Sequence, residues 1–175
     1  MDTLTNNLKT KIRHVPDFPK PGILFYDITT LLNDREGFRD TVAALAAPYR
    51  EQGIEQVVGI ESRGFILGAA VAGLLGSGFV PIRKPGKLPS KAFREDYALE
   101  YGTDGLEIHE DAVTRGQRVL VVDDVLATGG TAKAAASLVR RLGAELVGLS
   151  FLIELNFLRG RDQLAGDEVY SVLQY

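Results

Sequence analysis

The chain has 175 residues, 45% of them hydrophobic, and a formal net charge of −3. This length suits one α/β domain, and the acidic balance argues against a nucleic-acid-binding surface. The absence of cysteine excludes disulfide bonds and thiol chemistry. The first residues lack the apolar core of a signal peptide, and the longest apolar stretch, Phe65 to Leu75, is too short to cross a bilayer. We therefore expect a cytoplasmic protein that does not bind membranes.

The N-terminal residues combine a helical pattern with a segment that excludes helix. Apolar residues at positions 4, 8, 12 and 15 follow helical spacing and predict a short amphipathic helix. The next segment, Pro16 to Thr29, has prolines at positions 16, 19 and 21, which exclude helix. Its second half is apolar, so it either covers the core or forms a wall that holds a flat heterocycle.

A strand, a polar loop and a helix follow one another in the next part of the chain. A helical face runs from Phe38 to Tyr49, and Val57 to Ile60 reads as a buried strand. The loop Glu61 to Gly64 then leads into a Gly- and Ala-rich helix that ends near Gly76. Open α/β sheets bind ligands at the carboxyl ends of their strands. Arg63 is therefore either a pyrophosphate ligand or an ordinary exposed arginine.

The following segment is basic and leads into a predicted hairpin. A strand over Phe79 to Arg83 opens into a basic, Pro-containing stretch up to Arg94. Such a stretch is usually a solvated loop, but beside a pyrophosphate site it could act as an anion clamp. The residues from Tyr97 to Tyr101 and from Leu106 to His109 predict a β-hairpin with its turn at 102–105.

The rest of the chain is organised around thirteen residues, Val119 to Thr131, which read VLVVDDVLATGGT. The apolar run is typical of a strand buried on both faces, and two carboxylates follow it. The glycines then allow backbone N–H groups to approach an anion at the start of a helix. Carboxylates repel phosphate but suit vicinal hydroxyls, so the stretch predicts a sugar-phosphate site. A tight turn with an acidic cap is the simpler alternative.

Strands alternate with helices along the whole chain. After the central stretch we expect a strand over Leu146 to Leu155, a short helix over Leu158 to Leu164 and a strand over Val169 to Leu173. This order predicts an α/β fold with a doubly wound, mainly parallel sheet and helices on both faces. The chain's two histidines, His14 and His109, have no second ligand at metal spacing.

The thirteen-residue stretch closely resembles the signature of the type I phosphoribosyltransferases, which bind 5-phosphoribosyl 1-pyrophosphate (PRPP). The resemblance implies the fold of that family with a small hairpin hood. It also implies that Asp123 and Asp124 hold the ribose hydroxyls. The residues implied to wrap the 5-phosphate are Ala127, Thr128, Gly129, Gly130 and Thr131.

Two further motifs match the same family. The Ser-Arg-Gly sequence at 62–64 resembles its pyrophosphate loop, which implies a catalytic and PRPP-binding Arg63 and a cis peptide bond at Glu61–Ser62. Leu-Glu-Tyr-Gly at 99–102 matches its hood motif, which implies that Glu100 is the acid–base residue. The other residues implied to contact PRPP or AMP are Arg83, Lys87 and Tyr101.

The Pro-rich segment is similar to that of family members that act on adenine. Leu24, Phe25 and Tyr26 would then contact the base, although the family usually has arginine at the last position. The expected reaction is adenine plus PRPP giving AMP and pyrophosphate. Mg²⁺ would be held by the substrate and water rather than by dedicated protein ligands. The resemblance also implies a homodimer.

The expected organisation is a single phosphoribosyltransferase domain over residues 1–175. Residues 1–32 form the N-terminal helix and base-binding segment, and residues 84–111 form the basic loop and flexible hairpin hood. Three alternatives stay open: use of another purine base, a non-enzymatic regulator that senses PRPP, and a different sugar-phosphate enzyme such as a PRPP synthase.

Overall fold

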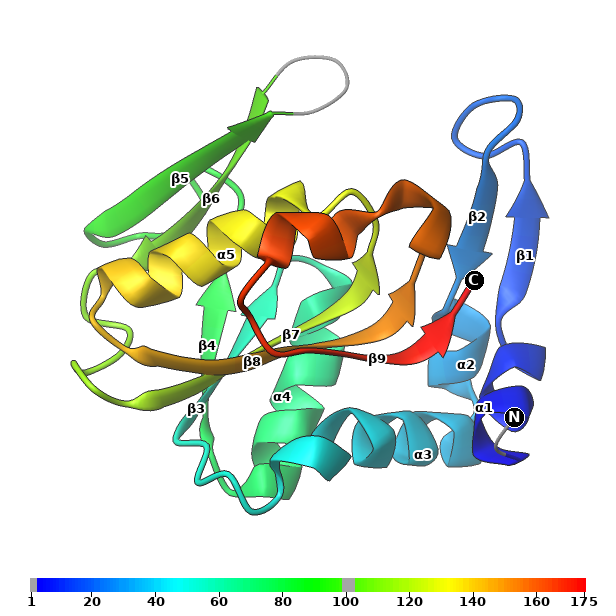
Figure 1. The fold of residues 1–175 in the computed structure, drawn as a ribbon, viewed down its shortest axis with the longest axis horizontal. Coiled ribbons are helices and arrows are strands. Elements are labelled where there is room, and N and C mark those ends of the chain that lie inside the picture. The colour runs from blue at the N-terminus through cyan, green and yellow to red at the C-terminus, as the bar shows by residue number, and fades with distance from the viewer. Residues whose placement is uncertain (1–2, 99–102) are drawn as a thin grey trace.

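The computed structural model describes residues 3–98 and 103–175, and its centre is a five-stranded parallel sheet (Figure 1). The strand order is β4-β3-β7-β8-β9, and each neighbouring pair is parallel. The predicted mainly parallel sheet is therefore confirmed. The five strands are β3 (Gln56–Ile60), β4 (Gly78–Ile82), β7 (Arg118–Leu126), β8 (Glu145–Glu154) and β9 (Val169–Gln174).

Helices cover both faces of this sheet, as predicted. Alternate residues of β7 point to opposite faces. Val119 and Val121 pack in the core beneath α5, whereas Leu120 and Val122 pack in the core beneath α3 and α4 (Figure 1). The helices are α1 (Thr3–Thr10), α2 (Thr29–Asn33), α3 (Arg35–Ala46), α4 (Arg63–Leu75) and α5 (Gly130–Arg141), with 3₁₀ turns at Ala47–Tyr49, Asn156–Leu158 and Gly160–Leu164. No helix in the described ranges is long and apolar enough to cross a membrane.

Two antiparallel hairpins stand beside the carboxyl ends of the central strands (Figure 1). One pairs β1 (Arg13–Pro16) with β2 (Leu24–Asp27), and the other pairs β5 (Ala92–Ala98) with β6 (Thr103–His109). An isolated bridge between Arg83 and Glu107 joins the second hairpin to the end of β4. The predicted hairpin is therefore present, but its first strand begins at Ala92 rather than at Tyr97.

Other predicted boundaries were also wrong. The first helix ends at Thr10 rather than near Val15, because Val15 pairs with Phe25 in the first hairpin. The turn of the second hairpin falls outside 103–105, because these residues pair with β5. The central strand continues through the two aspartates to Leu126, because β8 pairs with it along that length.

Close packing of α4 on β3 places the start of this helix at the end of the sheet. A Cβ atom on Gly59 would lie 2.7 Å from both the carbonyl oxygen of Gly64 and the ring of Phe79. A glycine in the strand is therefore what allows the first turn of α4 to approach. Since α4 begins at Arg63, this contact fixes the position of that arginine.

We predict that Gly59→Ala destabilises the protein by about 1–3 kcal/mol, the usual cost of adding a methyl group to a tightly packed core. Urea unfolding measures the change. A Gly59→Ala variant with the same free energy of unfolding as the parent would contradict the close packing of α4 on β3.

Candidate active site

A cavity of about 430 Å³ opens at the carboxyl ends of β3 and β7. Its walls come from β2, the loop after β3, the end of β7 and the loop before α5. It brings together eight residues that the sequence predicted for the site, namely Leu24, Phe25, Tyr26, Arg63, Asp123, Asp124, Ala127 and Thr131. Segments that are far apart in the chain thus meet at one place.

The two aspartates at the end of β7 are both buried, with 9% of Asp123 and 6% of Asp124 exposed. The backbone N–H of Asp124 donates to Oδ1 of Asp123 at 2.9 Å, and Nε of Arg63 donates to Oδ2 of Asp124. Burial raises the pKa of Asp123 well above its usual value, and the neighbouring charge of Asp124 raises it further. Both residues line the main cavity, so their carboxyl oxygens can accept hydrogen bonds from hydroxyl groups of a ligand.

A second, smaller cavity of about 60 Å³ lies inside the loop between β7 and α5. Gly129 precedes the helix with a φ of +87°, and a Cβ atom there would lie 2.3 Å from the carbonyl oxygen of Gly160. No side chain caps the helix, so its first N–H groups are available to an anion. Ala127, Thr128 and Thr131 also line this cavity, which suits a phosphate group.

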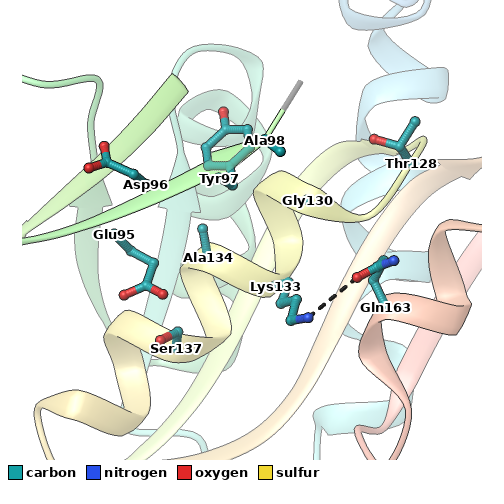
Figure 2. Close-up of a pocket in the computed structure, with 10 residues that line it drawn as sticks. All are labelled: Glu95, Asp96, Tyr97, Ala98, Thr128, Gly130, Lys133, Ala134, Ser137 and Gln163. Atoms are coloured by element: carbon teal, nitrogen blue, oxygen red, sulfur yellow. Dashed lines mark hydrogen bonds between the residues drawn. The ribbon is translucent and has the colours of Figure 1, made fainter. Parts of the chain in front are cut away.

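A third cavity, of about 490 Å³, separates the second hairpin from α5 (Figure 2). Thr128 and Gly130 line it, so the loop before α5 faces more than one cavity. The ring of Tyr97 lies close above Gly130, where a Cβ atom would come within 3.2 Å of Tyr97 Cδ2. The hairpin therefore already contacts the loop that is predicted to bind phosphate.

Arg83 and Lys87 lie beside the main cavity and do not line it. Arg83 donates to both carboxylate oxygens of Glu61, at 3.1 and 3.2 Å, and to the carbonyl oxygen of Lys87 at 3.2 Å. The hydrogen bonds from Arg83 hold the pKa of Glu61 below its usual value, so this pair stays charged. The arginine thus braces the loop that carries Arg63.

The comparisons with known proteins agree with this geometry. The family model described as the phosphoribosyl transferase domain matches residues 29–171. The chain belongs to the phosphoribosyltransferase family. It is 59% identical to an adenine phosphoribosyltransferase from Solibacter usitatus, over 97% of this chain and 98% of the relative.

Solved structures of phosphoribosyltransferases also match over almost the whole chain. Adenine phosphoribosyltransferase from Rhodothermus marinus is 56% identical, with a TM-score of 0.94 and 99% of both chains covered. The enzyme from Saccharomyces cerevisiae, in complex with adenine and an imino-altritol bisphosphate, is 40% identical, with a TM-score of 0.93 and coverage of 98% of this chain and 99% of that one. The type I phosphoribosyltransferase fold is therefore confirmed.

The site of this phosphoribosyltransferase includes a lysine that the sequence did not single out. Lys84 lines the main cavity, and its Nζ donates to the hydroxyl of Tyr97 at 3.0 Å and to the carboxylate of Asp104. Although burial lowers it, the pKa of Lys84 is raised overall by these hydrogen bonds. The basic composition of the segment was the available signal, but which cation faces the cavity depends on the pairing of the hairpin.

The loop after β3 and the residue after β8 also line the main cavity. The predicted cis peptide bond at Glu61–Ser62 is present, and Ser62 lines the cavity. Leu155 also lines it, and nothing in the sequence distinguishes this leucine from core residues. The predicted acid–base residue Glu100 and its neighbour Tyr101 lie outside the described residues.

We predict that Asp124→Asn weakens PRPP binding by about 1.5–3 kcal/mol, the usual worth of a hydrogen bond to a charged group, and leaves the fold intact. Calorimetric titration with PRPP measures this loss. Glu110→Gln, which removes an exposed carboxylate, is the control. If the Asp124→Asn variant binds PRPP with the affinity of the parent, the assignment of Asp124 to the ribose site is wrong.

We also predict that Asp123→Asn weakens PRPP binding yet raises the thermal unfolding temperature at neutral pH. The pKa of Asp123 is raised in the folded state. As the pH rises above the ordinary aspartate value, the unfolded chain therefore releases its proton first, and folding stability falls until the pH passes the raised pKa. Asn removes this dependence. The melting temperatures of the variant and the parent are measured between pH 3 and 8, a range that begins below the ordinary aspartate pKa of about 3.9. A difference between the two melting temperatures that stays constant over this range would contradict the account.

Proposed function

We propose that this chain transfers the phosphoribosyl group of PRPP to adenine, which gives AMP and pyrophosphate. The observation that carries the proposal is the buried acid pair Asp123–Asp124 beside a phosphate-sized cavity at a helix start. The adenine phosphoribosyltransferases to which the chain is similar add the choice of base. Formation of AMP from adenine and PRPP is the direct assay, and its absence in protein that binds PRPP would refute the proposal.

The acid pair and the loop before α5 hold the sugar phosphate. The carboxylates of Asp123 and Asp124 accept hydrogen bonds from the ribose hydroxyls, and the N–H groups from Ala127 to Thr131 surround the 5-phosphate. Together these contacts fix the ribose ring, so that C1 faces the wall formed by β2. Such positioning supplies much of the rate enhancement in a two-substrate reaction.

Arg63 stabilises the leaving pyrophosphate. The bond between C1 and the pyrophosphate oxygen breaks with its electron pair leaving on oxygen, and the ribose passes through an oxocarbenium-like state. N9 of adenine then forms the new bond to C1. The guanidinium of Arg63 lies in the cavity wall beside Asp124, where it can neutralise the developing charge. Lys84 also lines this cavity, and Arg83 and Lys87 lie beside it. All three add positive charge around the leaving pyrophosphate.

The base binds between apolar groups of β2 and the loop after β3. The ring of Phe25 packs edge-on against Phe18 at 5.2 Å, and the guanidinium carbon of Arg63 lies 5.8 Å from the centre of the Phe25 ring. Leu24 and Tyr26 complete this wall. We propose that Glu100 accepts or returns the proton of the purine ring, and that Tyr101, the next residue in the sequence, contacts the substrate.

Mg²⁺ is the expected cofactor, bound mainly by oxygens of PRPP and by water. The ion dehydrates reluctantly and prefers such mixed shells. The carboxylates that line the main cavity, Glu61, Asp123 and Asp124, would contact its water shell. When bound, it would neutralise charge on the pyrophosphate.

The whole chain from 1 to 175 acts as one catalytic unit in this proposal, and its place is the cytoplasm. The cavity takes walls from β2 near the N-terminal end and from Leu155 near the other end, which supports one unit. PRPP carries several negative charges and does not cross an apolar bilayer unaided. We therefore place an enzyme that consumes PRPP in the compartment where PRPP is made.

We further propose a homodimer formed through the outward side of α4. Ile66 and Leu74 are 47% and 43% exposed, and Ala69 and Gly73 lie between them on the same side of the helix. After Arg63 this helix carries no charged residue. An exposed apolar stripe without charges is typical of a surface that a partner subunit covers.

We predict that kcat/KM for adenine exceeds that for hypoxanthine and guanine, by up to about 10⁴-fold. A site that pairs with the 6-amino group leaves a buried polar group unpaired when a 6-oxo base enters. Steady-state kinetics with the three bases tests this. Comparable values would make the protein an enzyme of broader purine use.

We predict that Ile66→Glu converts the dimer into a monomer, because two buried charges would face each other across the interface. Sedimentation velocity measures the state. Phe157→Glu is the control, since Phe157 is 68% exposed but lies outside α4. A monomeric parent, or a dimeric Ile66→Glu variant, would refute the assignment of this interface.

A further inference from the structure

Tyr175 packs against the base-binding segment, although it follows the last strand of the sheet. Its ring centre lies 4.2 Å from that of Tyr26, with 40° between the planes. His14 packs edge-on against both rings, at 5.2 Å from Tyr26 and 6.0 Å from Tyr175. Since His14 pairs with Tyr26 across β1 and β2, the cluster joins the first hairpin to the end of β9.

The backbone of Tyr175 also supports a second wall of the cavity. Its N–H donates to the carbonyl oxygen of Glu154 at 3.0 Å, and its carbonyl oxygen accepts from the N–H of Asn156 at 2.9 Å. These two bonds lie on either side of Leu155, which lines the main cavity together with Tyr26. Tyr175 therefore contacts two parts of the cavity wall, β2 through its ring and the segment around Leu155 through its backbone.

The ring of Tyr175 is held from another direction by Lys9. Nζ of Lys9 lies 4.5 Å from the ring centre and donates to the carbonyl oxygen of Gln174 at 2.7 Å. By contrast, the Tyr175 hydroxyl is buried and has no hydrogen-bond partner among the described residues. Burial, with a smaller contribution from Tyr26, raises the pKa of Tyr175 to about 12, so the ring stays neutral. The described contacts of the Tyr175 side chain are therefore made by its ring and not by its hydroxyl.

We propose that Tyr175 is a positioning residue for the base site. Its ring holds Tyr26, and with it β2, at a fixed separation from Leu155, so that the cavity keeps the width of a planar purine. The inference rests on the proposed adenine reaction and extends it to a residue that does not line the cavity. It also gives Tyr26 a role that needs no charge: its ring packs against the ring of Tyr175 and anchors the strand.

The test compares Tyr175→Leu, which removes the ring but keeps an apolar side chain, with Tyr175→Phe, which removes only the unpaired hydroxyl. We expect Tyr175→Leu to raise KM for adenine by about tenfold, the effect of losing a good aromatic pair. KM for PRPP and kcat should stay within about twofold of the parent. Tyr175→Phe should match the parent. His14→Ala, at an exposed position of β1, should shift KM for adenine in the same direction but less.

Amide hydrogen exchange over Leu24–Asp27, measured without substrates, tests the packing independently of activity. We expect faster exchange of this strand in Tyr175→Leu and unchanged exchange in Tyr175→Phe. The proposal is overturned if KM for adenine is unchanged in both Tyr175→Leu and His14→Ala, or if KM for adenine and for PRPP rise equally. A parent protein that forms no AMP would instead refute the proposed function, while the exchange measurement would still decide the packing.

Discussion

The burial of two adjacent carboxylates at the end of β7 is the constraint on which the site depends. Asp123 and Asp124 are nearly excluded from solvent, and burial opposes the ionisation of Asp123. Such an arrangement costs stability, because a buried carboxylate loses its hydration. Arg63 offsets part of this cost through its ion pair with Asp124. Hydroxyl groups of a bound ribose would donate to the remaining acceptor oxygens. The folded protein thus already holds these oxygens in place before the sugar binds.

The surrounding elements meet around this acid pair. Close packing between α4 and β3 at Gly59 brings Arg63 to the carboxyl end of the sheet, and α5 begins directly after the loop that follows the pair. The two hairpins then stand on either side of the same edge (Figure 1). The first hairpin lines the cavity with the residues proposed to contact the base. The second contacts the loop proposed to bind phosphate through Tyr97, which also bonds to Lys84 in the cavity wall.

The sequence predicted those parts of the molecule that follow from local pattern. The apolar run and small residues of Val119 to Thr131 predicted the central strand, loop and helix. The cis bond at Glu61–Ser62 was implied only by the resemblance of the loop motif to that of the phosphoribosyltransferase family. The missed features depend on long-range packing. Leu155 looks like any core leucine, Lys84 is selected only by the pairing of the second hairpin, and Tyr175 reaches the base segment through the order of strands in the sheet.

The central claim is that the acid pair recognises the hydroxyls of a phosphorylated ribose. Calorimetric titration with ribose 5-phosphate and with 2-deoxyribose 5-phosphate tests it most directly, because the two ligands share the phosphate and differ in one hydroxyl. The account predicts that the deoxy sugar binds more weakly by about 1.5–3 kcal/mol, one hydrogen bond to a charged group. The difference should shrink when Asp123 and Asp124 are both replaced by Asn. Equal affinity of the parent protein for the two sugars would contradict the account.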